Sequence, residues 1–284
     1  MSIPIIESVA AMQQFSLARR AEGKRLGFVP TMGYLHEGHT SLMHMLRPQC
    51  DILVASIFVN PMQFGPKEDF SHYPRDMEHD RQLCEDAGCD VIIHPMPQEI
   101  YPTGFHTHVA VEYLTETLCG PWRPGHFHGV TTVVAKLFNI VMPHVAAFGQ
   151  KDAQQATIIK QMVRDLNFPI EIVIGPTIRE ADGLAKSSRN VYLSPEERRE
   201  AIALFRALSL GKAMIEKGER DPAIVIAAMR RLIEQEVRAP EIQYIEIVNM
   251  RDLHPVQKIE GEVLMALAVR IGKTRLIDNF MLTV

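Results

Sequence analysis

Two histidines, His36 and His39, stand three residues apart directly after a predicted strand, and this arrangement suits the binding of phosphate. The apolar run Leu26–Thr31 predicts the strand, and a helical pattern begins near Gly38. Free N–H groups and the helix dipole favour anions at a helix N-terminus, and glycine lets the backbone come close to a ligand. We therefore expect both imidazoles to donate hydrogen bonds to phosphate oxygens.

The same pair has two other interpretations. The zinc motif of metalloproteases places its histidines four residues apart on one helix face, whereas these two are three apart with Gly38 between them. Two unrelated histidines with structural partners would also give this pattern. The spacing argues against zinc and favours phosphate binding over the structural interpretation.

Polar side chains also follow the next predicted strand, Asp51–Val59. Asn60 and Gln63 are framed by proline and apolar residues, which suits binding of a small polar substrate, although an ordinary turn has the same composition. A glutamine amide donates and accepts at once, as recognition of a hydroxy acid requires. Ligands of doubly wound sheets bind where strands lead into helices, so this segment is a candidate part of the same site.

A third segment, Gly149–Asp152, follows a short apolar run and opens a helix. Lys151 offers positive charge to a phosphate, and Asp152 offers a helix cap or an acceptor on the side of a bound Mg²⁺. Gln154 and Gln155 fall in the first helical turn, close enough to contact whatever the segment binds. A capped helix start with solvated charges is the alternative.

Basic and hydroxyl side chains gather again in the run Asp182–Asn190. Four of its residues offer hydroxyl donors and two cations to a polyphosphate: Lys186, Ser187, Ser188 and Arg189. Such groups help most when they meet charge that develops in a transition state. A basic interdomain linker is the alternative. A further run rich in Gly, Pro and His, Arg123–Gly129, either closes over a ligand or merely connects two elements.

An alternation of strands and helices over the first 175 residues or so positions these segments. The run Asp51–Val59 is apolar on both faces, as in a sheet covered by helices on both sides. Further strands are expected at Asp90–His94, Val145–Phe148 and Ile170–Ile174, and helices at Arg75–Ala87, Thr131–Val141 and Asp152–Leu166. The fold class is therefore α/β, with a doubly wound (Rossmann-like) parallel sheet.

The pattern changes after Gly175-Pro176, where we place a domain boundary. Ser194-Pro195-Glu196-Glu197 predicts a capped helix that runs to about Lys217, and a second helix follows Asp221-Pro222. Two strand-like runs come next, followed by a last motif: Ile242–Val248, Val263–Ile271 and Arg275–Asn279. Residues 1–176 are thus expected to bind nucleotide and substrate, and residues 177–284 to form a smaller C-terminal α+β lid domain.

The composition excludes several classes of function. The chain has 284 residues, 46% of them hydrophobic, and a net charge of −4, so it has no bulk attraction to nucleic acid or to anionic membrane. No apolar tract reaches the length of a membrane span, and the first residues lack a secretory pattern. The four cysteines form no Cys-x-x-Cys pair, so reduced thiols and a cytoplasmic location are expected.

The order of these motifs resembles the nucleotidylyltransferase superfamily and, within it, the pantoate–β-alanine ligase family. The resemblance is carried by Pro30–His39, Phe58–Phe64, Arg123–Phe127, Phe148–Asp152, Asp182–Asn190 and Arg275–Asn279. It implies that the carboxylate of pantoate attacks the α-phosphate of ATP to give pantoyl adenylate and pyrophosphate. The amine of β-alanine then displaces AMP to give pantothenate. It also implies a homodimer, and Mg²⁺ that accompanies ATP and is bound largely by phosphates and water.

The family's binding residues match particular positions of this chain. The resemblance assigns ATP binding to Met32, Gly33, Tyr34, Leu35, His36, Glu37, Gly38, His39, Gly149, Gln150, Lys151, Asp152, Ile178 (by its backbone), Lys186, Ser187, Ser188 and Arg189. It assigns pantoate binding to Gln63 and Gln155, with Gln63 also near β-alanine, and it implies no metal ligands on the protein. The implied catalytic residues are His36, His39, Lys151, Ser187, Ser188 and Arg189, with His39 as proton donor. Glu37 acquires no role of its own.

Two positions depart from the family's usual pattern. His128 stands where many relatives carry Arg, so a charge contact there is expected only when the histidine is protonated. Lys186 stands where an apolar residue is more usual, and it either strengthens binding of pyrophosphate or points to solvent. Two other functions are a nucleotidyltransferase for a phosphorylated substrate, such as a phosphopantetheine adenylyltransferase, and a non-catalytic nucleotide-binding protein. The C-terminal domain argues against the first, and the presence of both histidines and the basic run against the second.

Overall fold

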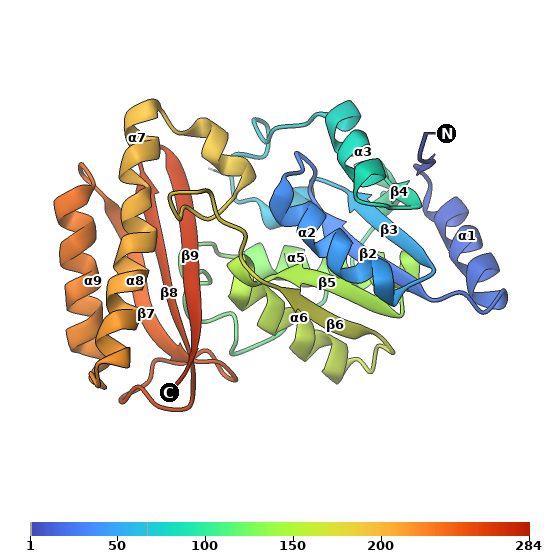
Figure 1. Ribbon diagram of the computed structural model, residues 1–284. Coiled ribbons are helices and arrows are strands. Elements are labelled where there is room, and N and C mark those ends of the chain that lie inside the picture. Colours follow the sequence, from blue (N-terminus) through green and yellow to red (C-terminus); the bar gives the residue numbers. More distant parts are fainter. Residues whose placement is uncertain (1, 67) are drawn as a thin grey trace. The chain divides into compact units, whose positions relative to one another are not determined.

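Six parallel strands form one sheet within residues 2–66 and 68–284, the part of the chain that the computed structural model describes (Figure 1). These strands are β1 (Ile5–Ile6), β2 (Leu26–Thr31), β3 (Ile52–Ile57), β4 (Val91–Ile93), β5 (Val145–Gly149) and β6 (Glu171–Gly175). Their order is β1–β4–β3–β2–β5–β6. The order therefore reverses between β2 and β5, and doubly wound sheets bind ligands at such a switch point, outside the carboxyl ends of the strands.

Helices cover both faces of this sheet because its central strands are apolar on both sides. The helices of this part are α1 (Val9–Ala21), α2 (Glu37–Leu46), α3 (Met77–Asp86), α4 (Pro97–Ile100), α5 (His126–Val141) and α6 (Ala153–Asp165). Met43 of α2 and Cys84 of α3 pack in one core cluster with Val29. The neighbouring residue Phe28 points the other way, and its ring meets that of Phe138 in α5 edge to face at 6.5 Å. The predicted doubly wound parallel sheet is confirmed.

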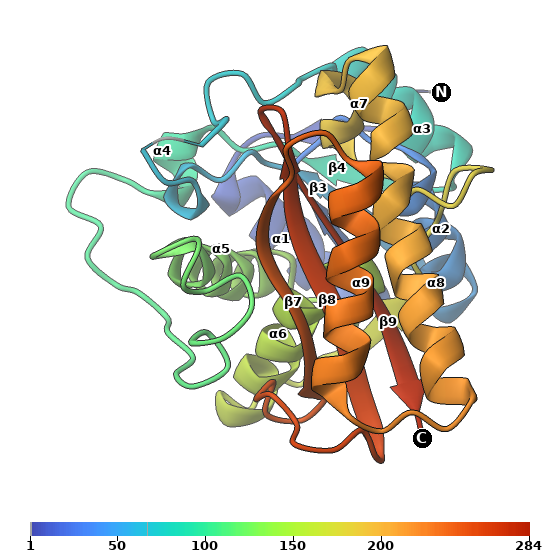
Figure 2. The same cartoon turned by 90° about the vertical axis from the view of Figure 1, so that its left-hand side faces the viewer.

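An antiparallel sheet and its helices form the C-terminal α+β part, which is also confirmed. Its elements are α7 (Pro195–Glu200), α8 (Ile202–Glu216), α9 (Pro222–Glu236), β7 (Glu241–Asn249), β8 (Glu262–Ile271) and β9 (Thr274–Thr283). The strands are arranged in the order β7–β8–β9, and α8 and α9 lie side by side along them (Figure 2). Leu208 of α8, Met229 of α9 and Leu267 of β8 belong to one buried cluster between helices and strands.

The chain divides into two compact units that do not follow the sequence strictly. The first consists of Met1–Val111, Arg123–Gly149 and Ile158–Pro176, and the second of Glu112–Trp122, Gln150–Thr157 and Thr177–Val284. Two segments that precede residue 176 thus group with the C-terminal residues. The functional division into residues 1–176 and 177–284 stays a prediction.

Several elements differ from the sequence prediction. The helix expected from Ser194 to Lys217 is interrupted at Ala201, whose carbonyl accepts the Leu204 N–H three residues on, at 3.2 Å. The short edge strand β1 precedes β2, so His36 follows the second strand rather than the first. The motif Arg275–Asn279 lies within β9, a third antiparallel strand. Strand partners supply hydrogen bonds that periodicity alone does not reveal.

Two further expectations concerned reduced cysteines and the absence of a membrane-spanning segment. All four cysteines are free thiols, and Cys50 is half-buried while the other three are buried. Within the described residues, no helix combines the length and the apolar character that a membrane crossing requires.

Candidate active site

His36 and His39 lie together at the N-terminus of α2, where their rings accept backbone hydrogen bonds. Nδ1 of His36 accepts from the Gly38 N–H at 3.1 Å, and Nδ1 of His39 accepts from the His36 N–H at 3.2 Å. The ring centroids are 4.2 Å apart. A backbone N–H only donates, so both Nδ1 atoms are unprotonated and each neutral ring carries its hydrogen on Nε2. The pair therefore provides two Nε2–H donors at a helix end that favours anions.

The turn from β2 into these histidines has a left-handed backbone that a buried carboxylate stabilises. Gly33 has φ 83° and Tyr34 has φ 49°. Asp80 of α3 accepts the N–H groups of Tyr34 at 2.8 Å and Leu35 at 2.6 Å, and its side chain is 1% exposed. Burial raises the pKa of Asp80, and these hydrogen bonds only partly oppose that rise. Asp80 thus sets the path of the backbone into His36.

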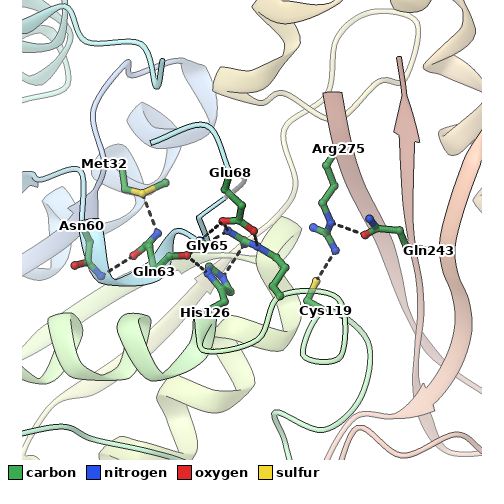
Figure 3. A network of polar contacts seen from close by, with 10 residues as sticks. Met32, Asn60, Gln63, Gly65, Glu68, Cys119, His126, Gln243 and Arg275 are labelled. Atoms are coloured by element: carbon green, nitrogen blue, oxygen red, sulfur yellow. Dashed lines mark hydrogen bonds and ion pairs between the residues drawn. The ribbon is translucent and has the colours of Figure 1, made fainter. Parts of the chain in front are cut away.

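Gln63 closes the 3₁₀ turn Pro61–Gln63 after β3, and its side chain is buried against Asn60 and Met32 (Figure 3). Nδ2 of Asn60 donates to Oε1 of Gln63 at 3.1 Å. Nε2 of Gln63 lies 2.9 Å from the sulfur of Met32. Both ends of the Gln63 amide therefore have a partner within the protein, since Oε1 accepts from Asn60 and Nε2 donates to the Met32 sulfur. An amide nitrogen carries two N–H groups, so Gln63 keeps a second N–H beside the one directed at Met32.

The backbone of Gln63 is bound by the residues that begin α5 (Figure 3). Arg123 makes two hydrogen bonds of 2.7 Å to Glu68 and donates to Nε2 of His126 at 2.9 Å. Because arginine only donates, Nε2 accepts, and Nδ1–H of His126 donates to the Gln63 carbonyl at 2.8 Å. Burial would raise the pKa of Glu68, but the hydrogen bonds and charge of Arg123 outweigh it and bring the pKa below its usual value.

The run Arg123–Gly129 is therefore more than a plain connection, because it contains the first turn of α5 and contacts the segment that carries Gln63. The helix α5 begins at His126, not at Thr131 as expected, because this first turn packs on the backbone next to Gln63. A Cβ on Gly129 would overlap the carbonyl of Met62, so the close approach requires glycine. His128 is exposed on the same turn, and its ring lies 5.0 Å from that of His108.

In the second compact unit, Asn279 of β9 binds the backbone of Gln150 and Lys151. Its Nδ2 donates to the carbonyl of Gln150 at 3.0 Å and to that of Lys151 at 2.9 Å. The Lys151 ammonium lies 3.6 Å from the Asp152 carboxylate. These residues form a 3₁₀ turn directly before α6, so β9 determines where the Lys151 backbone lies.

The two glutamines at the start of α6 have different environments. Gln154 is buried, and its amide accepts from the Cys119 N–H at 2.9 Å and donates to the carbonyls of Leu114 and Thr117. Gln154 is thus a structural residue that fastens a loop. Gln155 is half-buried, and among the described residues its side chain makes no hydrogen bond. Of the two, Gln155 is the one whose amide is suited to a ligand.

The basic run follows a tight hairpin that is fixed to β9. The Lys186 N–H donates to the Ile178 carbonyl at 2.9 Å, and Arg179 pairs with Ala185 as a β-bridge. Arg179 also makes a bidentate pair with Asp278 at 2.6 and 2.9 Å, and Asp278 is 3% exposed. Asp278 and its neighbour on β9, Asn279, therefore fix both segments that carry predicted ATP-binding residues in this unit.

The residues of the basic run have different environments within the protein. Ser187 caps the 3₁₀ helix Ser188–Tyr192, and its hydroxyl accepts the Arg189 N–H at 3.3 Å. Ser188 is buried. The ammonium of Lys186 lies 3.8 Å from the carboxylate of Glu180, and its side chain is 18% exposed. Lys186 therefore does not simply extend into solvent.

The predicted site residues fall into two groups, one in each compact unit. The first group lies at or beyond the carboxyl ends of strands β2, β3 and β5 of the parallel sheet: Met32–His39, Gln63 and Gly149. The second group belongs to the C-terminal unit: Gln150–Asp152, Gln155, Ile178 and Lys186–Arg189. Across residues 2–66 and 68–284, no three His, Cys, Asp or Glu side chains cluster as metal ligands. Each group by itself is of a kind that binds phosphate, since the first provides neutral donors at a helix N-terminus and the second provides cations and hydroxyls.

Comparison with known proteins decides the family. The model of the pantoate-beta-alanine ligase family matches residues 4–281. The chain belongs to this family. The resemblance noted from the sequence motifs is therefore confirmed over nearly the whole chain.

Individual members of the family are similar over their full length. Pantothenate synthetase of Moorella thermoacetica is 58% identical over 283 residues, with 99% of each chain covered. The crystal structure of pantothenate synthetase from Thermus thermophilus has a TM-score of 0.92 at 44% identity, covering 98% of this chain and 99% of that one. The pantoate-beta-alanine ligase of Francisella tularensis, solved with beta-gamma ATP and β-alanine, has a TM-score of 0.78 at 32% identity, covering 99% and 98%.

Three residues received no role from the sequence, yet in the structure they lie next to predicted site residues: Asp80, Asp278 and Asn279. Asp80 has the helical spacing of the core residues Met77 and Cys84, and a carboxylate on an apolar stripe signals a buried partner. Asp278 and Asn279 end a motif that carried the resemblance, and their position inside an apolar strand gave a similar signal. Each binds backbone or side-chain groups that lie far away in the sequence.

Proposed function

We propose that this chain is an ATP-dependent ligase that joins pantoate to β-alanine, producing pantothenate, AMP and pyrophosphate. The single observation that carries the proposal is the family match over residues 4–281, since this reaction is the family's function. The geometry agrees with it, because two neutral imidazole donors stand at a helix N-terminus beside the switch point of a parallel sheet.

The reaction proceeds in two displacements. A carboxylate oxygen of pantoate bonds to the α-phosphorus of ATP, and the bond from that phosphorus to pyrophosphate breaks. The amine of β-alanine then bonds to the acyl carbon, AMP leaves with the electron pair of the broken C–O bond, and the nitrogen loses a proton. Neither step requires a covalent bond to the enzyme, so positioning and charge stabilisation provide the catalysis.

The residues at β2 and in the second unit would act on the polyphosphate. Nε2–H of His36 and of His39 would donate to phosphate oxygens as negative charge moves to the leaving group. Neutral His39 carries its hydrogen on Nε2, because its Nδ1 accepts the His36 N–H. Its expected role as proton donor is therefore proposed as donation of a hydrogen bond from Nε2. Cations and hydroxyls would offset the charge of pyrophosphate: Lys151, Lys186, Ser187, Ser188 and Arg189.

Pantoate would be bound by the two glutamine amides. Gln63 directs its amide nitrogen away from Asn60 and suits a carboxylate or hydroxyl oxygen of the substrate. Gln155 has an amide that makes no side-chain hydrogen bond to the described residues. Backbone contacts of Ile178 with ATP remain part of the proposal, and one lone pair of its carbonyl is already used by Lys186.

Mg²⁺ would accompany ATP without a protein cage. Asp152 is the acidic residue of the proposed Gly149–Asp152 segment. Mg²⁺ keeps much of its water and binds nucleotide phosphates readily, so phosphate oxygens and water fit as its main ligands. The bound ion would neutralise charge on the phosphates.

Pyrophosphate release tests the proposed function directly. Folded protein with ATP and Mg²⁺ should release pyrophosphate when pantoate is added without β-alanine, in a burst that becomes continuous turnover once β-alanine is present. Absence of both from folded protein would refute the ligase proposal. Pyrophosphate release with a phosphorylated pantetheine instead would favour a nucleotidyltransferase of the same superfamily.

Replacement of Lys186 tests whether this cation, which stands where an apolar residue is more usual, contributes to ATP binding or adenylation. Because the Lys186 side chain is largely buried and 3.8 Å from Glu180, Lys186→Met should weaken ATP binding or slow adenylation by about 3- to 10-fold through loss of one phosphate contact. The measurement is pyrophosphate release against ATP concentration. Lys258→Met, at a lysine that is 66% exposed, is the control and should change neither constant. Identical kinetics for both variants would show that Lys186 contributes neither to ATP binding nor to adenylation.

Several predictions remain part of the proposal. We infer a cytoplasmic homodimer that does not act on nucleic acid or membranes, with residues 1–176 binding nucleotide and pantoate and residues 177–284 acting as a lid. The family relationship supports these statements.

A further inference from the structure

Tyr101 lies at the start of a chain of hydrogen bonds that ends on the amide of Gln63. Its hydroxyl is 2.7 Å from Oδ1 of Asn60, and Nδ2 of Asn60 is 3.1 Å from Oε1 of Gln63. Tyr101 comes from the segment after α4, about 40 residues beyond the 3₁₀ turn that carries Gln63. Asn60 is 1% exposed, so its contacts are shielded from water.

The direction of each hydrogen bond in this chain follows from backbone groups. Oδ1 of Asn60 accepts from the Met62 N–H at 3.3 Å, and Nδ2 donates to the Gly129 carbonyl at 3.0 Å. An N–H only donates and a carbonyl only accepts, so the orientation of the Asn60 amide is unambiguous. The Tyr101 hydroxyl must then donate to Oδ1, and the Gln63 atom that faces Nδ2 must be its oxygen.

All four hydrogen-bonding positions of the Asn60 amide are therefore filled. Tyr101 supplies the shortest of its contacts, and the Met62 N–H is the longest. Without the hydroxyl, a buried oxygen would keep one long hydrogen bond, and the amide would shift away from Gln63. Burial raises the pKa of Tyr101, so its hydroxyl stays protonated and able to donate throughout the neutral range.

We propose that Tyr101 is a positioning residue for the pantoate site, which acts through Asn60 to hold the Gln63 amide so that the N–H not used by Met32 is available to the substrate. This inference rests on the proposed function, in which Gln63 binds pantoate. Tyr101 itself touches no reacting atom. Its ring is anchored independently of the hydroxyl, since it meets Phe105 edge to face at 5.1 Å and lies 6.0 Å from the ammonium of Lys136. Removal of the hydroxyl alone should therefore leave the ring in place.

The test is Tyr101→Phe, measured as pyrophosphate release against pantoate concentration. The KM for pantoate should rise about 3- to 10-fold, as for loss of one buried hydrogen bond, while the KM for ATP stays constant. Tyr113→Phe is the matched control, because that residue is 68% exposed, and it should behave like the unaltered protein. An unchanged KM for pantoate in Tyr101→Phe would overturn the proposal. Inactivity of the unaltered protein would instead overturn the proposed function, so the two failures are distinct.

A double-mutant cycle separates positioning from general destabilisation. If Tyr101 acts through Gln63, Tyr101→Phe should raise the pantoate dissociation constant in the unaltered protein but not in the Gln63→Ala background. Calorimetric titration with pantoate in the presence of a non-hydrolysable ATP analogue measures both without requiring turnover. An equal effect in the two backgrounds would show that Tyr101 acts elsewhere.

Asn60→Asp tests the same series of hydrogen bonds if Tyr101→Phe fails to fold. The substitution sets a carboxylate oxygen against Oε1 of Gln63, where the present amide donates. The Gln63 amide then has to turn its nitrogen inward, and pantoate should bind more than about 10-fold more weakly while ATP affinity is retained. Unchanged binding of pantoate would contradict the assigned orientation of Gln63 and with it the role of Tyr101.

Discussion

Replacing His39 by alanine should lower the adenylation rate on the order of 10²-fold or more, because it removes the hydrogen-bond donor proposed for the phosphate under attack. His39 Nδ1 accepts the His36 N–H at 3.2 Å, so its Nε2 hydrogen is the group lost to the ligand. The measurement is single-turnover pyrophosphate formation with pantoate and ATP. His44→Ala changes an exposed histidine on the same helix and should leave the rate unaltered.

His39→Gln separates hydrogen-bond donation from capping of the helix. A glutamine at this position of a helix can accept the N–H of the preceding cap residue through its oxygen and still donate through its nitrogen. We expect it to retain more adenylation activity than His39→Ala. Full activity of His39→Ala in folded protein would remove this residue from the mechanism.

Replacing Asp278 by alanine should destabilise the C-terminal unit by about 3–5 kcal/mol, as for loss of one member of a buried ion pair. The carboxylate is 3% exposed and binds Arg179 through two hydrogen bonds of 2.6 and 2.9 Å. Burial raises the pKa of Asp278 and outweighs the hydrogen bonds and charge of Arg179, because removal from water disfavours the charged carboxylate. Arg179 also lies over the rings of Phe205 and Phe280, at 4.8 and 5.2 Å.

Urea unfolding followed by circular dichroism measures this loss as a lower midpoint at an unchanged slope. Glu236→Ala is the control, since Glu236 pairs with an Arg206 that is 60% exposed, and its midpoint should barely move. Replacing both members, as Arg179→Met with Asp278→Leu, should recover much of the stability, because no buried charge then lacks a partner. A single variant as stable as the unaltered protein would show that the pair contributes nothing.

Much of the fold followed from local patterns. The strand predicted at Leu26–Thr31 has the bounds of β2, and the second C-terminal helix ends at Glu236 near the predicted limit. Apolar runs between helical patterns suffice for a parallel sheet, since the crossover helices must cover both faces. Elements without a strong period were not recovered: β1 has two residues and exists because β4 offers it hydrogen bonds.

The site was predicted as a set of residue types rather than as a set of oriented atoms. The spacing of His36 and His39 indicated phosphate binding, yet it did not indicate that each Nδ1 is occupied by a backbone N–H. The composition of Arg123–Gly129 does not reveal its role, because that role depends on the Gln63 backbone, 63 positions before His126. Local composition carries no information about such a partner.

The sequence by itself therefore determined the family, most of the succession of elements and the histidine pair that is proposed to bind phosphate. These features depend on neighbours within a few residues of each other, where periodicity and capping act. Only the tertiary structure decided which end of each polar side chain is available to a substrate. Asp80, Tyr101 and Asp278 act on partners 45, 41 and 99 positions away, and the direction of a hydrogen bond is set by whichever donor or acceptor the fold places opposite.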